Sequence, residues 1–173
     1  WAHVRRKFIE ALKYEQSASQ GAVDLISKLY GVEKIIREKR TLSSEQILKL
    51  RSEQSKPIVD EFFSYLDTKL AEGAFLPNNL FTNACQYAFK LKEGLMLYLS
   101  EPDLPIDNNH TERTIRPIVL GRKNWLFCWS EVGAKSLTIV QTLISSCVLQ
   151  GISPSDYLNH IFSNIDTITN KNV

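Results

Sequence analysis

The chain has 173 residues, of which 43% are hydrophobic and 23% charged, and its charges nearly cancel to a formal net charge of +2. This composition predicts a soluble globular body with a sizeable core, excludes a strong overall field and confines any basic surface to a local patch. The three cysteines have no C-x-x-C spacing, so neither a disulfide framework nor a zinc site is indicated. No apolar run or leader indicates a membrane span or secretion, and we expect a cytoplasmic protein.

The opening residues have the spacing of an amphipathic helix with no capping residue ahead of it. Apolar side chains recur at Trp1, Val4, Phe8, Ala11 and Leu12. The first residue is also not Met. We therefore interpret the chain as a fragment of a longer protein.

Two further helical patterns follow in the first half of the chain. After a polar break over 15–20, apolar spacing predicts a helix over 23–36, although Gly31 weakens its continuity. Ser43 and Gln46 have capping-box spacing and predict the start of the next helix. Pro57 should kink that helix or restart it.

The second half begins with the most regular helical pattern of the chain, over 80–99, which we expect in the core. The aromatic run over 124–129 predicts a short strand or hairpin. A further helix over 137–148 should stop at Gly151, and Ser153 with Pro154 should cap a last one. With no repeat or flexible linker visible, these patterns predict a mainly α fold.

Candidate chemistry is concentrated between Asp107 and Pro117, where carboxylate, amide and guanidinium groups follow one another, and in the basic stretch over 121–125. A purely structural interpretation stays open. Asn109 would cap a helix, Glu112 would be its capping-box partner, and Arg116 would pair with Glu112 one turn later.

Three motifs together resemble the insertion-sequence-66 (IS66) transposase family. They are Asp-Asn-Asn-x-x-Glu-Arg-x-Ile-Arg-Pro over 107–117 followed by Gly-Arg-Lys-Asn-Trp-Leu-Phe over 121–127, Trp-Ala-His-x-Arg-Arg-Lys-Phe over 1–8, and Gly-Ile-x-Pro-x-x-Tyr-Leu over 151–158. The order of the motifs agrees with the family, and they cover nearly the whole chain. The resemblance identifies the chain as the C-terminal portion of such a transposase.

This resemblance implies a DDE-type recombinase with a ribonuclease-H-like core, in which two aspartates and a glutamate hold two divalent metal ions. Glu112 matches the glutamate, as catalytic residue and metal ligand, whereas both aspartates would lie upstream of Trp1. Asp107 does not match either aspartate. Mg²⁺ or Mn²⁺ is therefore expected in the intact parent protein, and none bound to this fragment, which would be inactive alone.

The resemblance also divides the chain as a single fragment into four segments. Residues 1–14 would be a helix of the truncated catalytic core, and 15–100 a helical, bundle-like insertion. The glutamate motif and basic segment would occupy 101–130, and a C-terminal helical element 131–173. The expected fold is therefore this insertion plus the terminal helical part of the core, with at most a short strand or hairpin near 124–129. If the strands of the core lie upstream, Trp1, Val4 and Phe8 are candidates for exposed apolar surface.

Transposon-end DNA is the expected partner, and a homo-oligomer away from the membrane is the expected state. Basic side chains would contact phosphates without reading sequence, and an aromatic ring would stack on an unpaired base. Solvated salt bridges and core packing are the competing interpretations. The candidate DNA-binding residues are Asn108, Asn109, Arg113, Arg116, Arg122, Lys123 and Trp125.

A rival function is a non-catalytic helical module for DNA binding or oligomerisation. The two hypotheses differ in the surroundings of Glu112. A metal ligand should lie on an open surface that other parts of a transposase complete, whereas a structural residue should cap its helix or pair with Arg116.

Overall fold

A computed structural model describes residues 1–39, 41–73, 75–76, 78–125, 128–165 and 167, except for the side chains of residues 123–125. Among the described residues it is mainly α-helical, as the sequence predicts for the fold class, and it contains no strand, unlike the short strand or hairpin predicted near 124–129. The chain divides into two compact units, an N-terminal unit of Trp1–Asn109 and a C-terminal unit of His110–Val173. Because the division falls at the first residues of a helix, α7 (Asn109–Trp125), no linker composition marks it.

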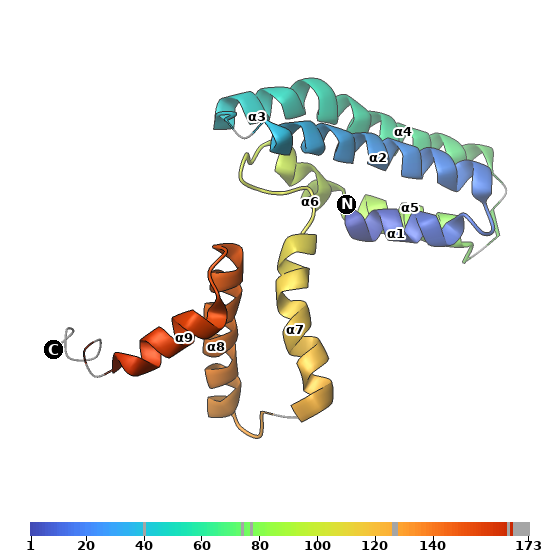
Figure 1. The fold of residues 1–173 in the computed structure, drawn as a ribbon. Helices are drawn as coiled ribbons and strands as arrows, with labels where there is room; N and C mark the ends of the chain where they lie inside the picture. Colours follow the sequence, from blue (N-terminus) through green and yellow to red (C-terminus); the bar gives the residue numbers. More distant parts are fainter. Residues whose placement is uncertain (40, 74, 77, 126–127, 166, 168–173) are drawn as a thin grey trace. The chain divides into compact units, whose positions relative to one another are not determined.

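The N-terminal unit is a helical bundle in which α1 packs against α2 and α5, and α2 packs against α4 (Figure 1). Its elements are α1 (Ala2–Ala11), α2 (Gln16–Glu38), α3 (Ser44–Leu50), the π-helical turn η1 (Arg51–Ser55), α4 (Lys56–Glu72), α5 (Leu80–Lys90), α6 (Lys92–Met96) and the 3₁₀ turn η2 (Leu97–Leu99).

Aromatic rings form the centre of this unit. The Phe62 ring lies 5.2 Å from the Trp1 ring and 5.8 Å from the Phe8 ring, both edge to face. Phe8 in turn contacts Phe81 at 5.8 Å. The expectation that Trp1, Val4 and Phe8 expose apolar surface is therefore wrong, because the unit buries all three in its own core.

The predicted helix boundaries hold where the signal is local. Ser43 and Gln46 form the capping box, with Gln46 N donating to Ser43 Oγ (3.3 Å) and Ser43 N to Gln46 Oε1 (2.9 Å). Gly31 does not interrupt α2. The predicted polar break over 15–20 is shorter in the structure, since α2 already begins at Gln16.

Pro57 acts as a restart, because η1 intervenes between α3 and α4 and Pro57 occupies the first turn of α4. A missing backbone donor is tolerated in that turn. The predicted continuous helix over 80–99 is wrong in one respect. It breaks at Leu91, whose ψ of 5° leaves the helical range. Ala84, Ala88, Leu95 and Tyr98 of the predicted pattern are buried as expected, whereas Leu80 and Leu91 are exposed.

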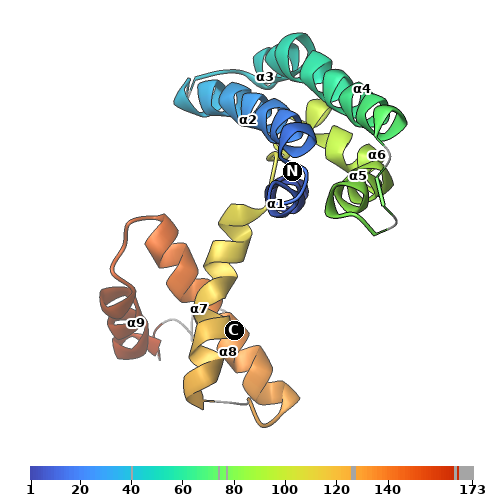
Figure 2. The same cartoon turned by 90° about the vertical axis from the view of Figure 1, so that its right-hand side faces the viewer.

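The C-terminal unit consists of α7, α8 (Glu131–Leu149) and α9 (Pro154–Ser163), with α8 packed against α9 (Figure 2). Its turns follow the sequence signals. Gly151 has a positive φ of 69° and forms a Schellman motif, in which Ile152 N donates to Cys147 O (2.9 Å), and Ser153 caps α9. The strand-like run is instead helical at Asn124 and Trp125, while residues 126 and 127 lie outside the described part of the chain.

Apolar side chains of this unit are largely exposed. Among its described residues, Gly121 and Cys147 alone are buried. On α8, Val132, Ile139 and Val148 are more than half exposed. This helix is also, by length and composition alone, long and apolar enough to cross a membrane, which the sequence analysis missed because Ser, Thr and Gln interrupt the apolar run.

Candidate functional site

Glu112 lies in the first turn of α7, and its side chain is exposed. Arg116 and Val119 follow it four and seven residues later, so the three side chains share one face of the helix. Arg116 is exposed as well. A carboxylate near a helix N-terminus is favoured by the helix dipole, and here it is also accessible from solvent.

The same side of α7 is apolar beyond Glu112. Ile115, Val119 and Leu120 are 49%, 54% and 50% exposed, although their spacing is that of a packing face. An apolar face that stays uncovered marks a surface for further contacts. Glu112 therefore lies at the edge of a surface suited to packing.

Arg113 points to the other side of α7, where it lines a pocket of about 540 Å³ in the C-terminal unit. His110 and Thr114 line the pocket from α7, and Ile144 and Val148 line it from α8. The Thr114 Oγ1 atom donates to the His110 carbonyl oxygen of the preceding turn at 3.0 Å. Glu112 is not among the residues that line this pocket.

The other candidate DNA-binding residues are Asn108, Arg122, Lys123 and Trp125. Asn108 and Arg122 are exposed. Lys123 and Trp125 are part of α7, but the structure describes only their backbone and not their side chains. The described part of the chain contains no group of three or more His, Cys, Asp or Glu residues arranged to hold a metal ion.

Asp107 is the anchor of the motif in the N-terminal unit. Its carboxylate accepts hydrogen bonds from the Tyr30 hydroxyl (2.7 Å), the Asn109 backbone N–H (3.0 Å) and the Asn109 side-chain amide (2.7 Å). Burial and the Asp107 carboxylate raise the pKa of Tyr30, which keeps the hydroxyl protonated as a donor. Asp107 thus orders the start of α7, and the side-chain amide of Asn109 donates to this carboxylate.

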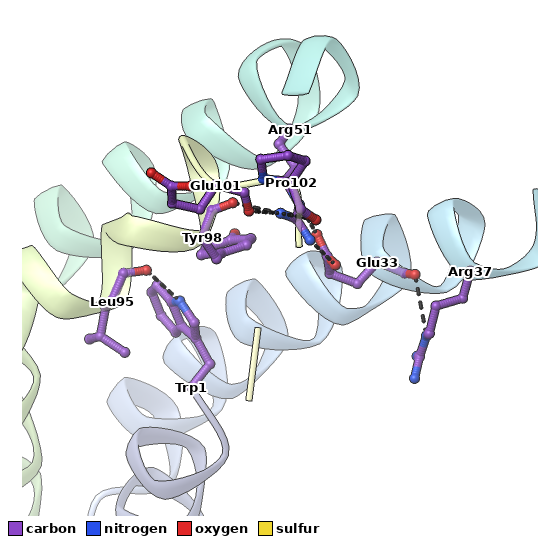
Figure 3. Close-up of polar contacts among 8 residues, drawn as sticks. All are labelled: Trp1, Glu33, Arg37, Arg51, Leu95, Tyr98, Glu101 and Pro102. Atoms are coloured by element: carbon purple, nitrogen blue, oxygen red, sulfur yellow. Dashed lines mark hydrogen bonds and ion pairs between the residues drawn. The ribbon is translucent and has the colours of Figure 1, made fainter. Parts of the chain in front are cut away.

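A buried arginine holds the loop that leads to the motif (Figure 3). The Arg51 guanidinium makes two 2.8 Å contacts with the Glu33 carboxylate. It also donates to the carbonyl oxygens of Tyr98 (2.7 Å), Glu101 (2.9 Å) and Pro102 (3.4 Å). Both charged groups are buried, so the pair and its carbonyls fix the loop to α2 and η1.

Sequence reasoning missed both of these anchors. Tyr30 and Asp107 are 77 residues apart, and Glu33 and Arg51 are 18 apart on different helices. No local spacing marks such pairs. The one available signal was the helical register of α2, which places Tyr30 and Glu33 three residues apart on neighbouring positions.

Comparison with known proteins gives a family. The model of the family described as "Transposase IS66 family" matches residues 1–136. The uncharacterized proteins y4qI and y4hP of Sinorhizobium fredii (strain NBRC 101917 / NGR234) are 34% and 32% identical to the chain, and each match covers 95% of it. The chain spans 30% and 31% of their lengths. No solved structure matches it.

Proposed function

Because this chain belongs to the IS66 transposase family, we propose that it is the part of a DNA transposase that contributes Glu112 to a metal-dependent site for DNA strand cleavage and transfer. The observation that carries the proposal is the placement of Glu112 in the motif, exposed in the first turn of α7 beside an uncovered apolar face. Alone, the chain is expected to be inactive.

The donor set fits a metal only in part. Glu112 is a hard carboxylate ligand of the kind that Mg²⁺ and Mn²⁺ prefer, but the described residues provide no cluster that would hold such an ion. Two divalent ions in such a site would activate the attacking oxygen and stabilise the leaving oxygen. The further ligands would therefore come from sequence outside this chain, and we assign Glu112 as one ligand of a shared site.

The exposed apolar surface supports a metal site that is shared between this chain and other parts of the protein. Relatives of this chain are about three times as long, since the chain spans 30–33% of them. Packing of that additional sequence on Ile115 and Val119 would cover the apolar face and bring further carboxylates to Glu112. We propose the same kind of protein contact for α8, whose exposed apolar residues would then be buried in the intact protein rather than in a bilayer.

The DNA partner follows from the family, and its contacts are proposals. Arg116 and Arg122 are exposed and available to DNA phosphates, and Asn108 is exposed as well. Arg113 contributes from the pocket side of α7. Lys123 and Trp125 stay candidates by sequence. We further propose a cytoplasmic homo-oligomer, because an exposed packing surface is also suited to self-association.

The test uses the full-length protein and labelled transposon-end DNA, with Mg²⁺ or Mn²⁺, and compares Glu112→Gln with Glu131→Gln. Glu131 is the matched control, because it is also an exposed glutamate in the first turn of a helix, where it pairs with Lys135. We expect Glu112→Gln to abolish cleavage and joining while DNA binding and folding persist. Full activity of that variant would refute the metal-ligand role.

The alternative is a non-catalytic helical module for DNA binding or oligomerisation. The observation that favours it is the complete core of the N-terminal unit, which needs no other sequence to bury its aromatic residues. In that case Glu112→Gln and Glu131→Gln would leave strand cleavage equally unchanged, and loss of DNA binding or of assembly would follow substitutions elsewhere.

A further inference from the structure

A basic pocket of about 430 Å³ lies on the N-terminal unit. Arg5, Arg6 and Ile9 line it from α1, Ser27 and Tyr30 line it from α2, and Asn109 lines it from the first residue of α7. The spacing explains its position. Val4 and Phe8 point into the core, so the residues beside them on α1 form the wall of the hollow between the two helices.

The two arginines provide positive charge, and within the described part of the chain neither guanidinium forms an ion pair or a hydrogen bond. Arg5 is half-buried and Arg6 is exposed. Guanidinium groups are planar and carry a fixed fork of N–H donors, which suits the oxygens of a phosphate group better than a point charge does. The pocket is therefore suited to an oxyanion with several acceptor oxygens.

The other polar groups of the pocket are already committed. The Ser27 hydroxyl donates to the Val23 carbonyl oxygen (2.8 Å), and the Tyr30 hydroxyl donates to Asp107. Asp107 is the nearby carboxylate that would repel an anion, but its oxygens accept three hydrogen bonds from Tyr30 and Asn109. Those donors hold it in place and partly compensate its charge, so Arg5 and Arg6 stay available.

Apolar surface completes the site. Arg5 and Arg37 both oppose the rise in the pKa of the Tyr30 hydroxyl, although Arg37 does not line the pocket. Ile9 is 40% exposed beside the arginines. The two arginines lie next to the aliphatic side chain of Ile9 and the ring of Tyr30. This combination suits a phosphate that carries a sugar and a base, rather than an isolated inorganic ion.

We propose that this pocket binds a backbone phosphate of DNA, with Arg5 and Arg6 donating to its oxygens and the adjoining sugar lying against Ile9 and Tyr30. The choice of DNA as the source of the phosphate rests on the proposed function, whereas the anion site rests on the pocket. Its arginines belong to α1 rather than to α7, so they would hold a further point on the DNA and help to set its register.

The test measures binding of the 173-residue chain to a fluorescent DNA duplex over a range of salt concentrations. The variant is Arg5→Gln/Arg6→Gln. The control is Lys34→Gln/Lys49→Gln, which removes the same charge from two exposed pairs with Glu38 and Glu53 outside the pocket. Arg5 is half-buried and the other three side chains are exposed, and equal melting temperatures will show that the variants fold.

We expect the arginine variant to bind DNA about tenfold more weakly or worse, and its slope of log K against log salt to fall by about one for the lost phosphate. The lysine control should show a smaller loss. A second variant, Arg5→Lys/Arg6→Lys, should recover only part of the affinity, since it restores charge but not the fork.

Three results would overturn the proposal. They are equal affinities of the arginine and lysine variants, absence of DNA binding by the unaltered chain, and arginine-dependent binding of inorganic phosphate or a deoxynucleoside monophosphate with unchanged DNA affinity. The last would assign the pocket to a free phosphate compound. Glu112→Gln, tested in the same assay, separates the two hypotheses, because the metal-ligand role predicts unchanged DNA binding for that variant whatever the pocket does.

Discussion

Replacing Arg51 with Met is the most direct test of how the loop before the motif is held. Arg51 and Glu33 are 3% and 5% exposed. Removing the guanidinium leaves the Glu33 carboxylate buried without its partner and removes the donor from the Tyr98 and Glu101 carbonyls. Breaking a buried pair in this way costs about 3–5 kcal/mol, far more than the net contribution of an intact surface pair.

The assay is urea unfolding followed by far-UV circular dichroism, combined with amide hydrogen exchange. The Leu104 amide, which donates to Glu101 O (3.1 Å), should exchange faster in Arg51→Met because its loop is no longer fixed. The control is Lys34→Met, which breaks the exposed Lys34–Glu38 pair (3.7 Å) and should change stability by less than about 0.5 kcal/mol.

The double variant Glu33→Leu/Arg51→Met gives the decisive comparison. It leaves no buried charge, so it should be more stable than Arg51→Met alone. The reasoning is refuted if Arg51→Met costs less than about 1 kcal/mol, or if the double variant is the less stable of the two. Either result would mean that the stranded carboxylate is not what destabilises the single variant.

Four other predictions concern single positions. Tyr30→Phe removes the hydrogen bond to Asp107 and should destabilise the chain by about 1.5 kcal/mol in urea unfolding, the low end for a charged acceptor because the site is half-buried. Gly31→Ala, in a helix interior with open space, should raise stability by about 1 kcal/mol, whereas Gly151→Ala should lower it by about 1–2 kcal/mol because φ is 69° there. Burial raises the pKa of Cys85 from 9.0 to about 12, so above pH 9 the unfolded thiol ionises first, and stability should fall as pH rises from 9 towards 12, a loss that Cys85→Ala should remove.

Local signals predicted much of the secondary structure. The capping box of Ser43 and Gln46 and the turn at Gly151 depend on residues within a few positions of one another, so the sequence contains the whole cause. The strand expected at Trp125 failed because aromatic residues favour strands only weakly, and the helix that contains Glu112 continues through that position.

The same local signals did not predict the tertiary contacts. Trp1 has the pattern of an exposed helix face in a truncated core, yet it is buried, and its indole N–H donates to the Leu95 carbonyl oxygen (2.9 Å). In the candidate site, too, one part could be predicted from the sequence and another part could not. Glu112 was selected by resemblance to a family motif, and helix geometry then explains its exposure, but no pattern in the sequence indicated the Tyr30–Asp107 contact that orders the motif.

Arg51 recognises the loop at Glu101 and Pro102 through main-chain oxygens, which every residue type possesses. The two side chains can consequently be replaced without loss of these contacts, whereas the number of residues between them and η2 cannot change. Deleting or adding one residue would carry a carbonyl out of reach of the guanidinium. In a collection of related chains we therefore expect this stretch to tolerate substitutions while its length stays constant.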